Sequence, residues 1–368
     1  MGLATGTTAR ERTAADVLSS DSAEEPACRR TDKRRRTRRG RRTLLAALVA
    51  AAVVAPLSAA AQPRVPAPAP AVLAPVTAAT LDEVYAANRA NAAEAARMAA
   101  AHGDTHRAAV ERAMADPSRH LLAFDGRGSG RAIEVFGDLA HADRIAVLVP
   151  GSDTSLDTYD RFRAGAAALH HQLTRRAFAG TLPSSRPRLS DLSEGTRTAV
   201  VAWLGYETPG TVSAAVLTTG RAEQAAPHLR AFVHRLRGIA GEDARIFLLC
   251  HSYGSVVCGR AASGLDVDGI AFIGSPGTGA DSAADLHTPA PIWAARGTGD
   301  WVENIPHIKA DLFGTTVGFG TDPVSPAFGA HIFAAGDGGH SDYFRPGSAS
   351  LANLARIVLG EASGATRA

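Results

Sequence analysis

One serine of this chain stands where a nucleophile would be expected. Ser252 lies in the stretch CHSYG, directly after the apolar run RIFLLC. A serine that attacks acyl carbons is commonly held on a sharp turn between a buried strand and a helix, with small residues two positions before and two after it. Gly254 meets this requirement, and Cys250 is small enough to fit although it leaves less room for the turn, so we predict that Ser252 is a nucleophile. The alternative is an N-cap serine that begins the following helix.

A carboxylate and a histidine follow at the places expected for the rest of a catalytic triad. Asp300 lies in RGTGDWVEN after a predicted strand at 290–297, and His340 lies in GDGGHSDYF after a predicted strand at 330–335. Parallel strands bring such residues to the same edge of a sheet. The histidine would remove the proton of Ser252, and the carboxylate would orient the imidazole.

Each partner has rivals in the sequence. Asp300 also suits a simple turn, and Glu303 is a second acid beside it. His331 lies inside the predicted last strand, which favours a packing role, and the role of His307 is open. His251 adjoins the serine, but the turn should direct its side chain into the interior, so we interpret it as structural.

Two backbone donors are needed for the negative oxygen of a tetrahedral intermediate. We predict the N–H of Tyr253, the residue after the nucleophile, and a second N–H from the loop VPGSDTS. In that loop we favour Ser152, with Asp153 as the alternative. The letters PGSD also suit an ordinary turn.

Short apolar runs alternate with helical patterns through most of the chain, and this alternation predicts an α/β fold. Continuous apolar strands separated by helices indicate a mostly parallel central sheet covered by helices on both faces. The predicted strands cover 121–125, 131–139, 144–151, 198–205, 245–250, 267–276, 290–297 and 330–335, and the predicted helices cover 156–178 and 212–237.

The composition changes three times before this domain, which we place at 118–365. Residues 1–61 resemble an export signal or an N-terminal anchor, and residues 62–79 form a linker rich in proline and alanine. Residues 80–117 are rich in alanine and predict one helix broken at Gly103 or two packed helices.

The first segment has the order of an export signal. A basic cluster at 33–42 runs into the apolar stretch 43–61, whose final alanines suit cleavage. The apolar run before Pro56 is shorter than the ~20 residues that span a bilayer. The Arg41–Arg42 pair also fits a loose twin-arginine signal. We therefore expect a secreted or cell-surface protein exported by the Sec or twin-arginine route, with an uncleaved anchor as the alternative and membrane contact only through this segment.

The net charge of +3 has its source in the same segment. It holds 12 of the 39 basic residues and 6 of the 36 acidic ones, which leaves 27 basic and 30 acidic residues in the remainder. A mildly acidic body offers no basic face, so we expect no nucleic-acid partner.

Two cysteines follow the export segment. We expect Cys250 to end a strand and Cys258 to lie inside the next helix, farther apart than the ~7 Å between Cα atoms that a disulfide permits. The sequence contains no metal-ligand spacing of the CxxC or HExxH kind. A pair of cysteines in an exported chain invites a disulfide, but this geometry argues against one. We predict no metal and no cofactor.

Five motifs together resemble an exported α/β-hydrolase family of unknown function that is common in high-GC Gram-positive bacteria. They are VLVPG, AWLGYETP, CHSYGS, IGSPGTG and GHSDYF, and the resemblance covers roughly residues 121–360. It implies the α/β-hydrolase fold and carries Ser252, Asp300 and His340 over as the triad. Cys250 departs from the family, which usually has glycine there.

The connection from Ile273 to Pro291 is short and rich in small residues, which predicts no large apolar lid at this point. Cover would have to come from 152–192 or 313–329. This favours a small or polar ester, an amide or an acyl group of the cell envelope over a long-chain lipid. Three aromatic residues are candidates either for the pocket lining or for the core: Trp203, Tyr206 and Trp301.

The sequence therefore predicts a serine hydrolase that cleaves an ester or related acyl bond through an acyl-enzyme. A peptidase or acyltransferase with the same triad is the nearest alternative. A non-catalytic relative that binds ligands at the cell surface and an anchored adhesin are alternatives from other classes.

Overall fold

The structure is a computed structural model that describes residues 65–73, 75–180, 196–305, 309–312 and 315–361. The predicted export segment at 1–61 lies outside these residues. The part of the chain from Pro63 to Ala368 groups into one compact unit. Among the described helices, none combines the length and the apolar character needed to cross a membrane.

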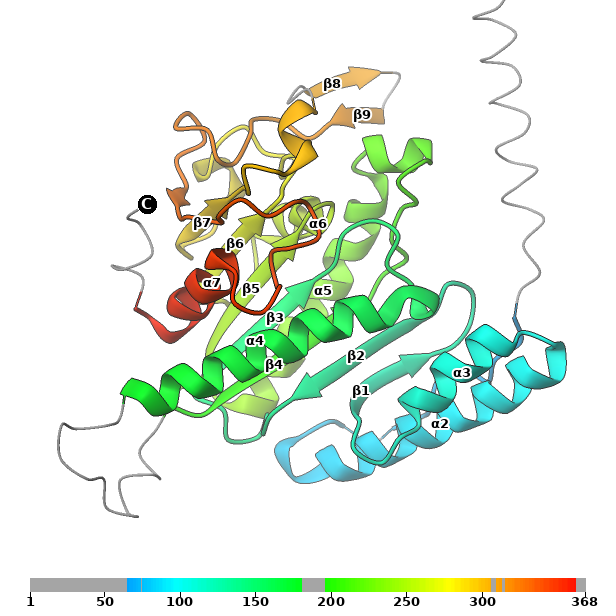
Figure 1. The fold of residues 1–368 in the computed structure, drawn as a ribbon. Coiled ribbons are helices and arrows are strands. Elements are labelled where there is room, and N and C mark those ends of the chain that lie inside the picture. The colour runs from blue at the N-terminus through cyan, green and yellow to red at the C-terminus, as the bar shows by residue number, and fades with distance from the viewer. Residues whose placement is uncertain (1–64, 74, 181–195, 306–308, 313–314, 362–368) are drawn as a thin grey trace, which may run out of the picture. The chain divides into compact units, whose positions relative to one another are not determined.

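An eight-stranded sheet forms the centre of the fold, in the order β1-β2-β4-β3-β5-β6-β7-β10 (Figure 1). The pairs β1–β2 and β2–β4 are antiparallel, and every later neighbour is parallel. The strands are β1 (His120–Asp125), β2 (Arg131–Phe136), β3 (Arg144–Val149), β4 (Thr198–Leu204), β5 (Arg245–His251), β6 (Gly269–Ile273), β7 (Ile292–Ala295) and β10 (His331–Ile332). The mostly parallel sheet confirms the predicted fold class.

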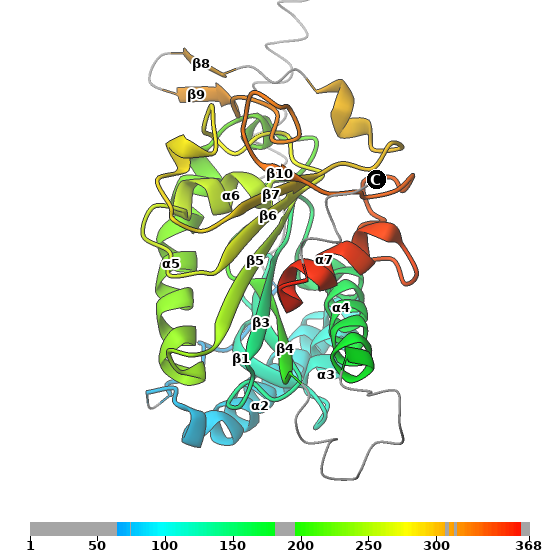
Figure 2. The same cartoon turned by 90° about the vertical axis from the view of Figure 1, so that its left-hand side faces the viewer.

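Helices cover both faces of this sheet. Helices α5 (Gly220–Ala240) and α6 (Gly254–Ala261) lie on one face, while α4 (Tyr159–Gly180) and α7 (Ala349–Leu359) lie on the other (Figure 2). Helices α2 (Leu81–His102) and α3 (Thr105–Met114) pack beside β1 and β2 (Figure 1). The short 3-10 helices are η1 (Ala78–Thr80), η2 (Leu156–Thr158), η4 (Ala214–Leu217), η5 (Ala284–Leu286) and η6 (Trp301–Asn304), and a separate hairpin is formed by β8 (Lys309–Leu312) and β9 (Thr315–Gly318).

The period of two along each strand divides the core into two layers. In β3, Ile145 and Val147 belong to the cluster under α5 and α6, whereas Ala146 and Leu148 belong to the cluster under α4 and α7. All four side chains are buried. Central strands buried on both faces need apolar residues at every position, and this explains the unbroken apolar runs in the sequence.

The alanine-rich segment forms two helices, as one of our two interpretations predicted. Gly103 ends α2 with φ of 90°, a left-handed conformation that favours glycine. The Asp104 carboxylate then accepts a hydrogen bond of 2.9 Å from the N–H of Arg107 and caps α3. A small cluster that includes Ala92, Ala95 and Phe124 joins the helix pair to the sheet.

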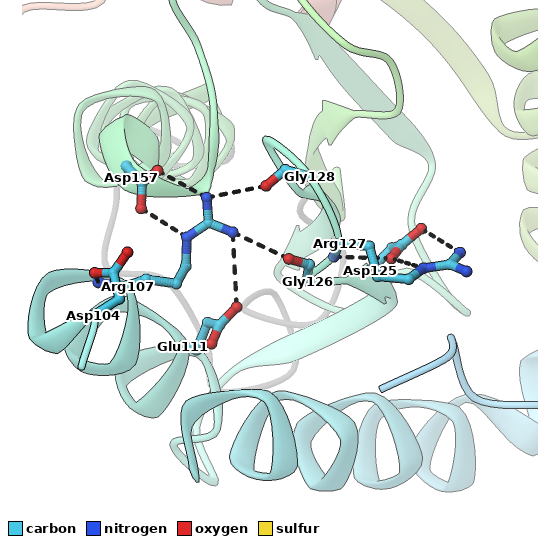
Figure 3. Close-up of polar contacts among 8 residues, drawn as sticks. All are labelled: Asp104, Arg107, Glu111, Asp125, Gly126, Arg127, Gly128 and Asp157. Atoms are coloured by element: carbon cyan, nitrogen blue, oxygen red, sulfur yellow. Dashed lines mark hydrogen bonds and ion pairs between the residues drawn. The ribbon is translucent and has the colours of Figure 1, made fainter. Parts of the chain in front are cut away.

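A buried arginine fastens this helix pair to two loops of the sheet (Figure 3). Arg107 donates to both carboxylate oxygens of Asp157, at 2.7 and 2.8 Å, and to the carbonyls of Gly126 and Gly128. Glu111 lies beside it, with 3.8 Å between its Oε1 and the Arg107 Nη1. The arginine therefore ties α3 to the β1–β2 turn and to η2.

The structure adds elements that the sequence analysis missed and shortens several that it predicted, among them β6 (predicted at 267–276) and β7 (predicted at 290–297). Helix α7 and the β8–β9 hairpin were not predicted, while the strand expected at 330–335 comprises only His331 and Ile332. The remaining predicted strands and helices are present, but the helix predicted at 156–178 begins with the 3-10 turn η2, and the one predicted at 212–237 begins only at Gly220, after the separate 3-10 turn η4. Ser348 caps α7 and Gly360 ends it, a pattern that could have revealed this helix.

Candidate active site

Ser252 lies on a sharp turn between β5 and α6. Its φ of 54° is one of three positive values at non-glycine residues in the described chain. Its N–H donates to the carbonyl of Ile273 at 3.0 Å. A Cβ at Gly254 would lie 2.5 Å from the carbonyl oxygen of Val149, so only glycine fits there without a shift. This is the role that the sequence analysis gave to the second small position.

The N-cap alternative for Ser252 is wrong. The N-cap of α6 is Tyr253, and no side chain caps this helix. The Ser252 hydroxyl instead lies 2.8 Å from Nε2 of His340. The turn therefore presents the hydroxyl to a base and not to the helix amides.

Asp300 and His340 meet Ser252 from two other strand ends. Asp300 follows β7 and His340 follows β10, the order that the sequence predicted. His340 Nδ1 lies 2.9 and 3.1 Å from the two carboxylate oxygens of Asp300. The structure thus brings the three predicted residues into one hydrogen-bonded chain, in which the carboxylate holds the tautomer with Nε2 free to accept the serine proton.

The Asp300 carboxylate is buried and fully hydrogen-bonded. Burial by itself would raise the pKa of Asp300, but hydrogen bonds from His340, from Tyr343 and from the N–H of Val302 hold that pKa below its usual range. The Tyr343 hydroxyl donates to Asp300 and accepts from the N–H of Gly297 at 3.1 Å. Tyr343 was overlooked in the sequence, although it stands three positions after His340 in GHSDYF.

His251 supports the loop that carries His340. Its Nε2 lies 2.8 Å from the backbone carbonyl of His340, and the two ring centres are 4.7 Å apart. Burial, followed by the nearby His340, lowers the pKa of His251 to about 4. A neutral His251 donates its Nε2–H to that carbonyl, which agrees with a structural role.

The loop after β3 lies directly against the nucleophile. A Cβ at Gly151 would stand 2.6 Å from the Cβ of Ser252. The N–H groups of Ser152 and Tyr253 donate to no acceptor among the described residues. The N–H of Asp153, the alternative donor, is already bonded to the carbonyl of Pro209 at 3.1 Å. Of the two candidates in this loop, Ser152 therefore has the available donor.

Asp153 instead fixes the shape of this loop. It adopts φ of 56°, and its carboxylate accepts hydrogen bonds from the N–H (3.0 Å) and the hydroxyl of Thr211. Thr208 and Thr154 exchange two further bonds, of 2.9 and 3.1 Å. The segment after β4 therefore holds the loop that carries Ser152.

Cys250 and Cys258 form a disulfide, and our prediction that they would not pair is wrong. Their Cα atoms are 6.4 Å apart, within bonding range. Helix α6 begins directly after the turn, and its Ser255 hydroxyl donates to the carbonyl of Cys250 at 3.0 Å. The start of the helix therefore lies against the end of β5, and this brings Cys258 close to Cys250. Both cysteines are fully buried.

The rival residues lie elsewhere. Glu303 is exposed on η6, and His331 is exposed on β10, where its ring lies tilted against Trp293 rather than packing in the core. His307 lies outside the described residues.

The three candidate pocket aromatics divide between core and surface. Trp203 is buried, and Tyr206 is also buried and donates its hydroxyl to the carbonyl of Pro150 at 2.7 Å. Trp301 is exposed beside His340, with ring centres 4.9 Å apart. The connection from β6 to β7 contains only the short η5, as expected for a chain with no large lid at this point.

A sequence model described as alpha/beta hydrolase matches residues 125–310. The chain belongs to this alpha/beta hydrolase family. The matched region includes Ser252, Asp300 and the loop with Ser152, whereas α2 and α3 precede it.

Curated relatives of this alpha/beta hydrolase are mycobacterial and uncharacterized. A protein of Mycobacterium tuberculosis is 27% identical over 272 residues, which are 66% of this chain and 39% of the relative. A protein of Mycobacterium bovis is 29% identical over 221 residues, which are 57% of this chain and 79% of the relative. The chain thus spans about two fifths of the length of the first of these relatives.

Solved structures with similar folds include hydrolases. A serine hydrolase without a lid from Xanthomonas campestris is 16% identical, with a TM-score of 0.37 over 65% of this chain and 91% of that one. The esterase PE8 is also 16% identical, with a TM-score of 0.37 over 61% of this chain and 96% of that one.

Proposed function

We propose that this alpha/beta hydrolase is a serine hydrolase that cleaves an ester or a related acyl bond through an acyl-enzyme on Ser252. The observation that carries the proposal is the hydrogen-bonded chain from the Ser252 hydroxyl through His340 to Asp300. This arrangement makes a serine nucleophilic at neutral pH without a metal or cofactor.

The first half-reaction forms the acyl-enzyme. Ser252 Oγ attacks the carbonyl carbon while its proton passes to Nε2 of His340, and Asp300 stabilises the resulting imidazolium. The negative oxygen accepts hydrogen bonds from the N–H groups of Tyr253 and Ser152. The bond between the carbon and the leaving oxygen then breaks, and His340 gives its proton to that oxygen.

The second half-reaction regenerates the enzyme. Water gives a proton to His340 and its oxygen attacks the acyl carbon, again with the negative charge at Tyr253 and Ser152. The bond to Ser252 Oγ breaks, and His340 returns the proton to the serine. The acid released carries the oxygen of water, so atoms and charges balance.

The size of substrate that the site can accept depends on which segments cover it. The described connection between β6 and β7 offers no large lid, which supports a small or polar acyl substrate, including one from the cell envelope. If the substrate is an amide, the same residues would act as those of a peptidase. If an alcohol takes the place of water, they would act as those of an acyltransferase.

The proposal is tested with a fluorophosphonate probe on the purified protein. We expect the wild type to label and Ser252→Ala and His340→Ala to remain unlabelled, while His331→Ala, a matched exposed histidine, labels at the wild-type rate. Folded wild-type protein that does not label would contradict the proposal and favour a ligand-binding protein.

We also propose that the protein is exported. The basic and apolar order of 33–61 supports export, and so does the buried disulfide, because disulfides persist in oxidising compartments. Expression of the full chain in a bacterial host, followed by fractionation and thiol counting, tests this. Recovery in the cytoplasm with free Cys250 and Cys258 would contradict it.

A further inference from the structure

Trp301 is the exposed tryptophan of this chain. Its exposed fraction is 52%, compared with 1% for Trp203, while Trp293 is half-buried beneath His331. A large aromatic side chain at the surface suggests a binding role when it adjoins a functional site. Trp301 directly follows Asp300 in the sequence.

The backbone of Trp301 belongs to the same turn that holds the triad acid. The Asp300 carboxylate accepts from the N–H of Val302 at 3.0 Å, and the Trp301 carbonyl accepts from Asn304 at 3.3 Å. The indole lies at 52° to the His340 imidazole, with 4.9 Å between ring centres. An exposed aromatic surface therefore lies beside the proposed catalytic base.

The proton path identifies which part of a substrate meets this surface. In the proposed reaction, His340 gives its proton to the leaving oxygen, so that oxygen must come within hydrogen-bond reach of Nε2. The acyl carbonyl, by contrast, points toward the N–H groups of Ser152 and Tyr253. We therefore expect the group attached to the leaving oxygen to be the part of the substrate nearest to Trp301.

We infer that Trp301 is a specificity-determining residue that binds the leaving group of the ester, and that this group carries a flat ring face. This inference rests on the proposed function. Aromatic rings and the apolar faces of pyranose sugars both stack on an indole, and either would gain contact area with little loss of freedom. A linear alcohol would gain much less.

Three acetate esters of primary alcohols test this: benzyl acetate, a 6-O-acetylglucoside and n-propyl acetate. They give the same acetyl-enzyme and differ only in the leaving group. For Trp301→Ala we expect kcat/KM to fall about tenfold on at least one ring ester and to change less than about twofold on n-propyl acetate. The ring ester that loses more identifies an aryl or a sugar leaving group, and Trp301→Phe should recover most of the loss.

The control is Phe178→Ala, which removes an aromatic of similar exposure, 50%, near the end of α4. It should leave all three rates unchanged. Equal losses on all three esters with Trp301→Ala would overturn the inference, because they would mean that the indole only positions His340. The inference would also be overturned if Trp301→Ala lowered kcat/KM on neither ring ester. The same holds if the wild-type protein reacts with fluorophosphonate but hydrolyses neither ring ester. Protein that fails to react with fluorophosphonate would instead overturn the proposed function.

Discussion

Two buried carboxylates in this molecule have opposite surroundings. Asp300, after β7, accepts hydrogen bonds from His340, Tyr343 and the N–H of Val302, and its pKa lies below the usual range. Glu111, on α3, has no hydrogen-bond partner among the described residues for either carboxylate oxygen. Burial raises the pKa of Glu111 to about 7, although Arg107 opposes the shift.

The difference shows that burial does not decide the charge of a carboxylate, whereas the supply of donors does. Arg107 gives its hydrogen bonds to Asp157, Gly126 and Gly128 and meets Glu111 only as an ion pair, at 3.8 Å (Figure 3). Asp300 has three donors aimed at it and stays ionised, which is the state that an imidazolium needs beside it. Of these two buried carboxylates, the one without hydrogen-bond donors has the raised pKa and the one with three donors has the lowered pKa.

The largest expected effect separates the two carboxylates by activity. Asp300→Asn should lower kcat by about a thousandfold or more, because the amide cannot stabilise the imidazolium or hold its tautomer. Glu111→Gln should change kcat less than about twofold. Hydrolysis of 4-nitrophenyl acetate measures both, and a similar loss in the two variants would remove the functional distinction.

The next effect separates them by stability. Arg107→Met should lower the free energy of unfolding by about 2–3 kcal/mol, because a buried cation with four partners is lost. Urea denaturation measures this. The matched control is Arg127→Met in the same region, where the guanidinium is exposed and Asp125 keeps its bond to Arg131. A midpoint lowered as much by Arg127→Met would contradict the role given to burial.

A smaller effect tests the donors around Asp300. Tyr343→Phe should lower kcat/KM about tenfold, because a hydrogen bond to a buried charge is lost. The carboxylate then binds protons and the imidazolium more tightly, so the acid limb of the pH profile should move to higher pH. Tyr85→Phe, at a buried tyrosine beside His120, is the control. An unchanged profile in Tyr343→Phe would mean that two donors suffice.

The smallest effect is the pH dependence of stability at Glu111. Between about pH 4.5 and 7 the unfolded chain ionises this residue while the folded protein keeps the proton, so the wild type loses stability as pH rises. Glu111→Gln lacks this loss and should gain about 1 kcal/mol on the wild type between pH 5 and 6. Thermal denaturation across this range measures the gain, and the exposed Glu303→Gln should show none.

The sequence predicted the parts of the fold that depend on local pattern. Apolar runs located the strands of the main sheet, and the order of Ser252, Asp300 and His340 after three of them located the candidate site. Contacts between residues far apart in the sequence could not be predicted in this way. Arg107 and Asp157, for example, stand 50 positions apart and belong to no motif. The disulfide was misjudged because the distance from Cys250 to Cys258 depends on where α6 begins, which sequence alone did not show.

The central claim is that an acyl group forms on Ser252, and rapid-quench mass spectrometry tests it most directly. The protein is mixed with 4-nitrophenyl acetate, quenched in acid within one turnover and digested. We predict one acetyl group on the peptide that contains Ser252, and none in the Ser252→Ala variant. Release of 4-nitrophenol without an acetylated peptide, or acetylation that persists in the variant, would contradict the account.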